Sequence, residues 1–151
     1  MARVKLKFPT KDLLFTTKIP VRITDLNYGN HLGNDQLIAI VHESRAQWLR
    51  HHHYSELDIG GCGLIMADLM VAYKSEGRYG DVLNIDIFAD ELSLVSFDLL
   101  YRIQAEFQGE SRLLAEAKTG MVCYDYQAGK ACSMPPSIKD LLLGGKYYKE
   151  E

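Results

Sequence analysis

The sequence predicts an α+β fold in which a curved antiparallel sheet of five strands wraps around one long central helix. Two observations predict it. Residues 37–41 are apolar without interruption inside a longer helical pattern, and four strand-like segments joined by short turns follow that helix. A helix that is apolar all round must be enclosed, and short links between successive strands favour antiparallel pairing. A curved sheet that wraps around the helix satisfies both conditions.

The first strand is predicted over residues 14–23, where apolar and polar residues alternate. Pro20 within it favours an edge position or a bulge, because proline cannot donate a ladder hydrogen bond. Residues 64–73 are apolar on both faces except at Asp68, a pattern typical of a central strand. Three more strands are predicted over 83–90, 97–107 and 113–126, with a hairpin turn at 108–111 and a short amphipathic helix near 138–143.

The long helix is predicted from Asp35 to about Leu49, with Asn34 or a neighbour as its cap. A polar, turn-rich loop at residues 25–34 comes directly before it. The strand, loop and helix therefore follow one another closely, and this loop is expected at one end of the sheet.

Length and composition suit a single domain over residues 1–151, with residues 1–12 and 145–151 peripheral. Apolar residues make up 47 % and the net charge is −3, which argues against nucleic acid as the main partner. No signal-peptide core and no apolar stretch of about 18 residues occurs. Three cysteines without a CxxC spacing are read as free thiols. These features predict a soluble, cytoplasmic chain with no membrane partner.

The loop before the helix gathers Asp25, Asn27, His31 and Asn34. Such residues are commonly turn formers and caps, and that interpretation has about an even chance for any one of them. As a group they place an imidazole, carboxamides and a carboxylate beside unpaired backbone N–H groups near Gly33. Those groups and the helix dipole favour a developing negative charge, such as the oxyanion of a thioester carbonyl.

Two carboxylates interrupt apolar segments. Glu43 follows the apolar run of the helix, and desolvation there would poise a carboxylate as a base near neutral pH. The alternative is simple exposure or a salt bridge to His42 or Arg45. Asp68 lies in an apolar strand, so it is expected to meet a partner or face a cleft.

No metal or cofactor is predicted. His51–His53 are consecutive and cannot converge as ligands, and cations at a helix end are explained by the dipole. The sequence has no HExxH, CxxC, GxSxG or glycine-rich phosphate motif.

The stretch VRITDLNYGNHLGNDQLIAIVHESRAQWL, residues 21–49, resembles the 4-hydroxybenzoyl-CoA thioesterase-like branch of the hotdog-fold thioesterase superfamily. Members typically read Asp-x-Asp-x-x-Gly-His-x-x-Asn, followed by an apolar helix that carries a Glu and often an Arg. The resemblance covers about residues 14–126 and continues at the turn before residue 82. The matching positions are Asp25, Gly29, His31, Asn34, Glu43, Arg45, Gly80 and Asp81, with Asn30 as one extra residue.

One departure from the family pattern concerns the catalytic carboxylate. Where many relatives carry the catalytic Asp, this chain has Asn27, and a carboxamide cannot act as base or nucleophile. Relatives of the plant acyl-carrier-protein thioesterases use Asn and His in this loop with a Glu on a following strand turn, and Glu76 is similar to that Glu. Glu43 is ranked above Glu76 as the base.

The resemblance implies hydrolysis of a small or medium acyl-CoA, or less readily an acyl-carrier-protein thioester, by a homodimer or homotetramer. It implies His31, Asn27, Asp25 and Glu43 as catalytic residues. Two other functions stay open: an enoyl-thioester hydratase or dehydratase, although its usual His-Phe-Pro context is absent, and a non-catalytic acyl-thioester binder, which Asn27 makes credible. The expected substrate contacts are Gly33, Asn34, Tyr28, Asp68 and Glu76.

Overall fold

The computed structural model describes residues 2–9 and 13–150, with side chains placed as far as residue 143. A 3₁₀ turn, Ile23–Asp25, follows the first strand. The other elements are β1 (Phe15–Pro20), α1 (Asn34–His51), β2 (Gly63–Tyr73), β3 (Val82–Asp90), β4 (Ser96–Phe107), β5 (Glu110–Asp125), β6 (Lys130–Ala131) and α2 (Pro136–Glu150).

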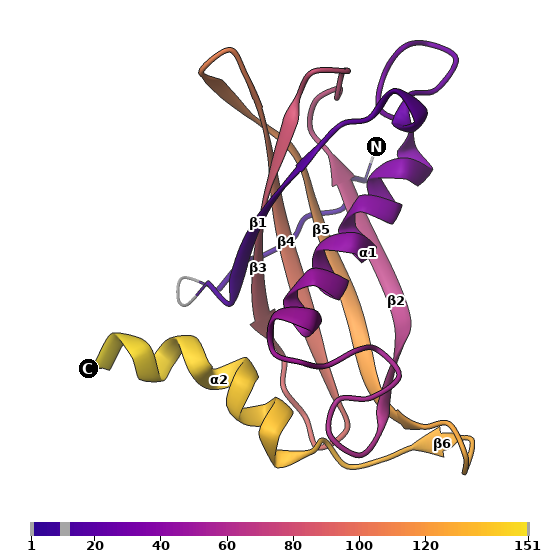
Figure 1. Cartoon of the computed structure of the whole chain (residues 1–151), viewed down its shortest axis with the longest axis vertical. Coiled ribbons are helices and arrows are strands. Elements are labelled where there is room, and N and C mark those ends of the chain that lie inside the picture. Colours follow the sequence, from indigo (N-terminus) through magenta and orange to yellow (C-terminus); the bar gives the residue numbers. More distant parts are fainter. Residues whose placement is uncertain (1, 10–12, 151) are drawn as a thin grey trace.

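The strands form one antiparallel sheet in the order β1-β3-β4-β5-β2, with α1 lying across its concave face (Figure 1). The α+β class and the central helix are confirmed. The sheet has six strands rather than five, because β6 pairs with the end of β5. The chain reverses where the carboxylate and carbonyl of Asp125 accept the N–H groups of the next turn. A two-residue strand is too short to show a period-two pattern in sequence.

The core lies between α1 and the sheet. Alternate residues of β3, β4 and β5 point toward the helix, as the period of two requires. The side chains below 1 % exposure include Trp48, Leu49, Leu83, Ile85, Ile87, Leu99, Tyr101, Ile103, Ala105, Ala115 and Ala117.

One flank of α1 is open to solvent, which corrects the expectation of full enclosure. Leu37, Ile40 and Val41 are buried, but Ile38 is only partly buried and Ala39 is exposed. The sheet of one chain covers one side of the helix, so the apolar residues on the other side remain accessible.

The two edges of the sheet differ from each other. Pro20 lies in edge strand β1, as the sequence predicted. The prediction of a central strand at residues 64–73 was wrong, because β2 is the opposite edge and pairs only with β5. Met66 of β2 is 45 % exposed. In this strand, apolar side chains on both faces do not indicate a central position in the sheet.

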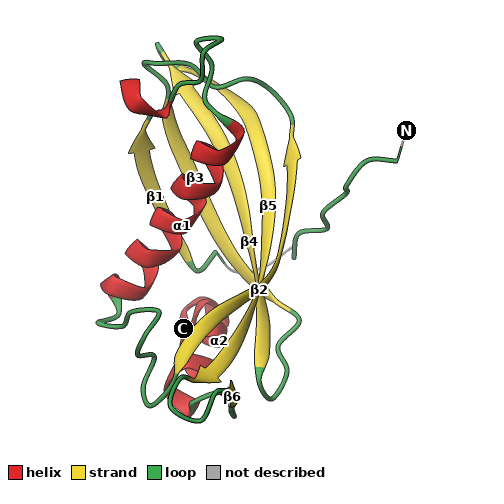
Figure 2. Cartoon of the chain, turned by 90° about the vertical axis from the view of Figure 1, so that its right-hand side faces the viewer, coloured by secondary structure: helices red, strands yellow, loops and turns green. Residues whose placement is uncertain are grey.

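The N-terminal segment crosses the face of the sheet opposite α1 (Figure 2). Phe8 meets Phe88 edge-to-face at 5.7 Å and lies 4.4 Å beneath the guanidinium of Arg102. This part of the chain is therefore packed on the sheet rather than loosely held. The peripheral placement expected for residues 10–12 and for the side chains of 145–151 lies outside the described residues. Within the described chain, no helix has the length and apolarity needed to cross a membrane.

Candidate active site

A pocket of about 180 Å³ lies between the loop that precedes α1 and the turn that follows β2. The loop, the first turn of α1, the end of β2 and one residue of β5 supply its walls. The lining residues are Asn27, His31, Leu32, Asn34, Leu37, Tyr73, Ser75, Glu76, Gly77 and Leu114.

The reactive side chains of the pocket are His31 and Glu76, whose Nε2 and Oε2 atoms lie 3.1 Å apart. Asn27 shapes the loop that presents the imidazole. Its side-chain oxygen accepts the N–H groups of Gly29 and His31, at 2.8 and 3.3 Å, and its own N–H donates to the His31 carbonyl. The amide NH₂ of Asn27 has no acceptor among the described residues, so it is the part of that side chain left to contact a ligand.

The close approach of the two loops depends on Gly77, which the sequence did not single out as a site residue. Leu32 donates its N–H to the Gly77 carbonyl at 2.8 Å. A Cβ at Gly77 would lie 2.8 Å from the Cβ of Leu32, too close for any side chain. The absence of a side chain at Gly77 therefore lets Glu76 reach His31.

Arg112 of β5 fixes the turn after β2 that carries Glu76. Its Nη2 donates to the carbonyl of Glu76 at 2.6 Å and to the buried carboxylate of Asp81 at 2.7 Å. No sequence pattern near residue 76 indicates this contact, because Arg112 comes from a distant strand.

The N-terminus of α1 forms the third wall. The N–H of Gly33 donates to the carbonyl of Asp25 at 3.0 Å and is therefore engaged. Asn34 begins the helix and lines the pocket. Within the described chain, the N–H groups of residues 34–36 have no acceptor. They can bind a negative charge together with the helix dipole. Tyr73 donates its hydroxyl to the carbonyl of Asn34 at 3.2 Å and so ties β2 to the start of the helix.

Asp25 lies behind the loop and does not line the pocket. Its buried carboxylate accepts the backbone N–H and the guanidinium of Arg22 at 2.8–3.3 Å. Burial would raise the pKa of Asp25, but hydrogen bonds and the charge of Arg22 outweigh it and the pKa is lowered from its ordinary value. Asp25 anchors the loop from inside the protein.

Three predicted site residues lie away from the pocket. Tyr28 is fully exposed at the tip of the loop. Glu43 is exposed on α1 and accepts a hydrogen bond from Gln47 at 2.7 Å, so the expected desolvation of Glu43 was wrong. Asp68 lies opposite Gly120 on the outer face of the sheet. As expected, its carboxylate has a partner, the ammonium group of Lys118 at 2.8 Å. The hydrogen bond from Lys118 lowers the pKa of Asp68.

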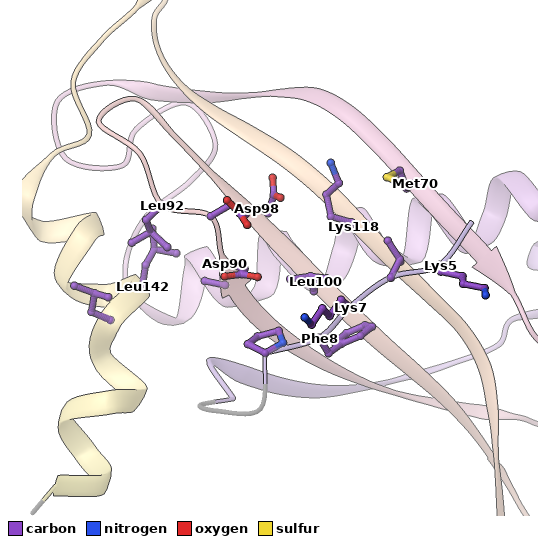
Figure 3. Close-up of a pocket in the computed structure, with 15 residues that line it drawn as sticks. Lys5, Lys7, Phe8, Met70, Asp90, Leu92, Asp98, Leu100, Lys118 and Leu142 are labelled. Atoms are coloured by element: carbon purple, nitrogen blue, oxygen red, sulfur yellow. The ribbon is translucent and has the colours of Figure 1, made fainter. Parts of the chain in front are cut away.

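A larger hollow, about 800 Å³, is on that outer face (Figure 3). The N-terminal segment, the sheet and Leu142 of α2 surround it, and its charged lining includes Asp90, Asp98 and Lys118. Among the described residues no histidine and no helix N-terminus lines it. Size alone does not make a reactive site, and the smaller pocket at His31 combines a histidine, a carboxylate and a helix N-terminus.

The cysteines and histidines do not form another reactive centre in the described chain. Cys62, Cys123 and Cys132 are free thiols. Burial and the two neighbouring cysteines raise the pKa of Cys62 to about 12, which disfavours a reactive thiolate. No group of three metal-ligating side chains occurs among the described residues.

The chain belongs to the thioesterase-like superfamily, whose family model matches residues 21–142. It is similar to the acyl-CoA thioester hydrolase YbgC of Escherichia coli O157:H7 and of Shigella flexneri. Each is 28 % identical over 127 residues, which cover 83 % of this chain and 92 % of the relative.

Solved structures share the hotdog fold of this chain. A 1,4-dihydroxy-2-naphthoyl-CoA thioesterase from Synechocystis superposes with a TM-score of 0.75 at 22 % identity, covering 85 % of this chain and 94 % of that one. A 4-hydroxybenzoyl-CoA thioesterase mutant, solved in complex with 4-hydroxybenzoyl-CoA, gives 0.75 at 15 % identity, covering 85 % and 97 %. The fold prediction and the family resemblance are thereby confirmed.

Proposed function

We propose that the chain is an acyl-CoA thioesterase that hydrolyses a small or medium acyl-CoA thioester to the free acid and CoA. The observation that carries the proposal is the His31–Glu76 pair, 3.1 Å apart, in a pocket that also contains Asn27 and the N-terminus of α1. The name of the YbgC relatives, acyl-CoA thioester hydrolase, supports the same activity.

In the proposed reaction the thioester carbonyl oxygen points toward the N–H of Asn34, where the helix dipole stabilises the oxyanion. His31 and the NH₂ of Asn27 orient the attacking water. Glu76 accepts a proton from that water while the oxygen bonds to the carbonyl carbon. The carbon–sulfur bond then breaks, and the proton held by Glu76 passes to the thiolate of CoA.

Glu76 rather than Glu43 is proposed as the base. A general base must be within hydrogen-bond reach of the water that it activates. Glu76 lines the pocket, whereas Glu43 is exposed along α1 and bonds to Gln47. Asp25 and Gly33 are proposed to position the loop, and Asp68 and Tyr28 have no place in this arrangement.

The direct test is release of free thiol from a panel of acyl-CoA esters, with acyl-carrier-protein thioesters assayed in parallel. Saturable hydrolysis of an acyl-CoA supports the proposal. Saturable binding without thiol release would instead identify a non-catalytic acyl-thioester binder, the function that Asn27 makes credible. Hydration of an enoyl-CoA without thiol release would identify a hydratase.

We further propose that the protein works as a homodimer or homotetramer in the cytoplasm. The open flank of α1 and the apolar edge strand β2 lie next to each other, and exposed strand edges of this kind pair readily. Light scattering after gel filtration should give a multiple of the 17.1 kDa chain mass. Met66→Lys should shift it toward the monomer, and a wild-type monomer would contradict the proposal. Free cysteines are typical of a reducing compartment.

A further inference from the structure

We infer that Arg45 and Thr119 form a subsite that recognises a neutral oxygen atom near the distal end of the acyl group. The inference rests on the proposed function, since it assigns the substrate class of the same enzyme. It is carried by unpaired hydrogen-bond donors in a groove next to the catalytic pocket.

The subsite is a groove of about 240 Å³ between α1 and the sheet. The groove and the catalytic pocket share no lining residue, but both lie along α1 and β2: Leu37 and Tyr73 line the pocket, and Ile38 and Leu69 line the groove. At roughly 30 Å³ for each non-hydrogen atom, the groove has room for about eight of them. The lining residues are Asp35, Ile38, Ala39, Val41, His42, Arg45, Met66, Leu69 and Thr119.

Arg45 supplies the first donor. The residue is 4 % exposed, with Nε donating to Glu56 at 2.7 Å and Nη1 donating to the Tyr101 hydroxyl at 3.2 Å. A guanidinium has five N–H donors and no acceptor. Nη2 has no acceptor among the described residues. Because every fully buried polar side-chain atom of the described chain has a hydrogen-bond partner, Nη2 is accessible to solvent. Arg45 therefore presents N–H groups to the groove.

Thr119 supplies the second donor. The Tyr101 and Thr119 hydroxyl oxygens lie 2.8 Å apart. Either hydroxyl can be the donor of this bond; because Arg45 can only donate to Tyr101, donation from Tyr101 to Thr119 is the arrangement that gives the buried Tyr101 proton an acceptor. The hydroxyl proton of Thr119 is then left without an acceptor among the described residues, and Thr119 lines the groove. A ligand that accepts hydrogen bonds would satisfy both Thr119 and Arg45.

The charges around the groove favour a neutral oxygen over a carboxylate. Glu56 already balances Arg45 at 2.7 Å, and His42 lies 3.2 Å from the same carboxylate oxygen. Asp35 adds a negative charge to the groove lining. A carboxylate on the ligand would be repelled by the carboxylates of Glu56 and Asp35. A hydroxyl, ketone or ether oxygen accepts hydrogen bonds from Arg45 and Thr119 without adding a charge.

The test compares three non-hydrolysable CoA thioethers by calorimetry on the intact protein: hexyl-CoA, its ω-hydroxy form and its ω-carboxy form. The hydroxy form should bind wild type about tenfold more tightly than the hexyl form, the combined gain expected from hydrogen bonds donated by Arg45 and Thr119. The carboxy form should bind less tightly than the hydroxy form. Thr119→Val should reduce the tenfold preference to about threefold, because Arg45 still donates to the oxygen, and Thr119→Ser should keep the preference.

Equal affinity of wild type for the hexyl and hydroxy forms would overturn the inference, and so would a preference unchanged by Thr119→Val. Failure of wild type to bind any of the three would overturn it as well. Thiol release from hexanoyl-CoA by the same preparation separates this result from the proposed function. Hydrolysis without a binding preference would refute only the subsite, whereas a binding preference without hydrolysis would refute only the enzyme.

Discussion

Two histidine–glutamate pairs lie at opposite ends of β2, and they differ in what else holds the carboxylate. After the strand, Glu76 meets His31 at 3.1 Å, and before it Glu56 meets His42 at 3.2 Å. Glu56 also accepts a hydrogen bond from the buried guanidinium of Arg45, and its side chain is 28 % exposed. Glu76 is 66 % exposed and, within the described chain, has no ion-pair partner other than His31.

Both carboxylates belong to glutamates and both contact a histidine. The contact of Glu56 with Arg45 therefore distinguishes the two pairs, whereas residue type and histidine partner do not. A carboxylate that accepts a hydrogen bond from a buried guanidinium is fixed in place, which suits an anchor for Arg45. A carboxylate whose ion-pair partner among the described residues is an imidazole, and which lines a pocket, is placed to contact a bound water, as the proposed reaction requires.

The largest expected effect is at the pocket pair. Glu76→Gln should lower kcat for acyl-CoA hydrolysis by about 10²–10⁴-fold, the usual loss when a general base is removed. Its unfolding midpoint in urea should match wild type, because the side chain is exposed. Thiol-release kinetics provide the measurement, with Glu110→Gln in the exposed β4–β5 hairpin as the matched control. A normal rate for Glu76→Gln together with a large loss in Glu43→Gln would make Glu43 the base.

The second-largest expected effect concerns the distance between His31 and Glu76. Gly77→Ala places a methyl group 2.8 Å from the Cβ of Leu32, so the turn and the loop must separate. Overpacking of this kind costs about 1–3 kcal/mol. Activity should fall about tenfold or more even though both His31 and Glu76 remain. Urea unfolding and kinetics are measured on the same sample. Gly109→Ala is the comparison for lost stability without a change at the pocket, because its added Cβ meets no atom within 4 Å but its φ of +82° strains the backbone. Unchanged activity in Gly77→Ala would contradict the need for close approach.

At the other end of β2 the expected effect is on stability. Glu56→Gln removes the counter-charge of buried Arg45. Breaking a fully buried ion pair costs about 3–5 kcal/mol, and the partial exposure of Glu56 reduces the expectation to about 1–2 kcal/mol. Urea denaturation should show this loss, whereas the same substitution at Glu76 should not. Equal free energies of unfolding for Glu56→Gln and Glu76→Gln would contradict the distinction between the two histidine–glutamate pairs.

The sequence predicted what depends on local pattern and missed what depends on contacts between distant segments. Alternating residues indicated the strands, and the left-handed backbone at Gln108 and Gly109 agrees with the predicted hairpin. The edge position of β2 was missed, because apolar residues on both faces do not reveal which neighbours a strand has.

The same distinction applies to the site. His31, Asn27 and Asn34 come from one short loop and helix start, so sequence proximity alone gathered them. Glu76 reaches them only through the contact between Leu32 and Gly77, which no local pattern encodes. The desolvation expected of Glu43 failed because an apolar run does not reveal which helix flank faces solvent.

The smallest expected effect concerns Asp25, whose buried carboxylate anchors the loop that carries His31. The pKa of Asp25 is lowered in the folded protein from its ordinary value of 3.8, so its ionised form stabilises the fold at neutral pH. This contribution is complete above about pH 5 and is lost as the pH falls through the lowered pKa. Asp25→Asn should therefore cost about 1 kcal/mol at pH 7, less than the roughly 1.5–3 kcal/mol of a hydrogen bond to a charged group, because Arg22 is exposed.

The cost of Asp25→Asn should shrink as the pH falls below about 4, where the wild-type carboxylate also becomes protonated. Urea unfolding of both proteins between pH 7 and pH 3 measures the difference. A constant difference over that range would show that the carboxamide disturbs packing rather than charge. A difference that shrinks, with hydrolysis at pH 7 reduced by less than in Glu76→Gln, would place Asp25 in support of the loop and leave proton transfer to the pair that faces the pocket.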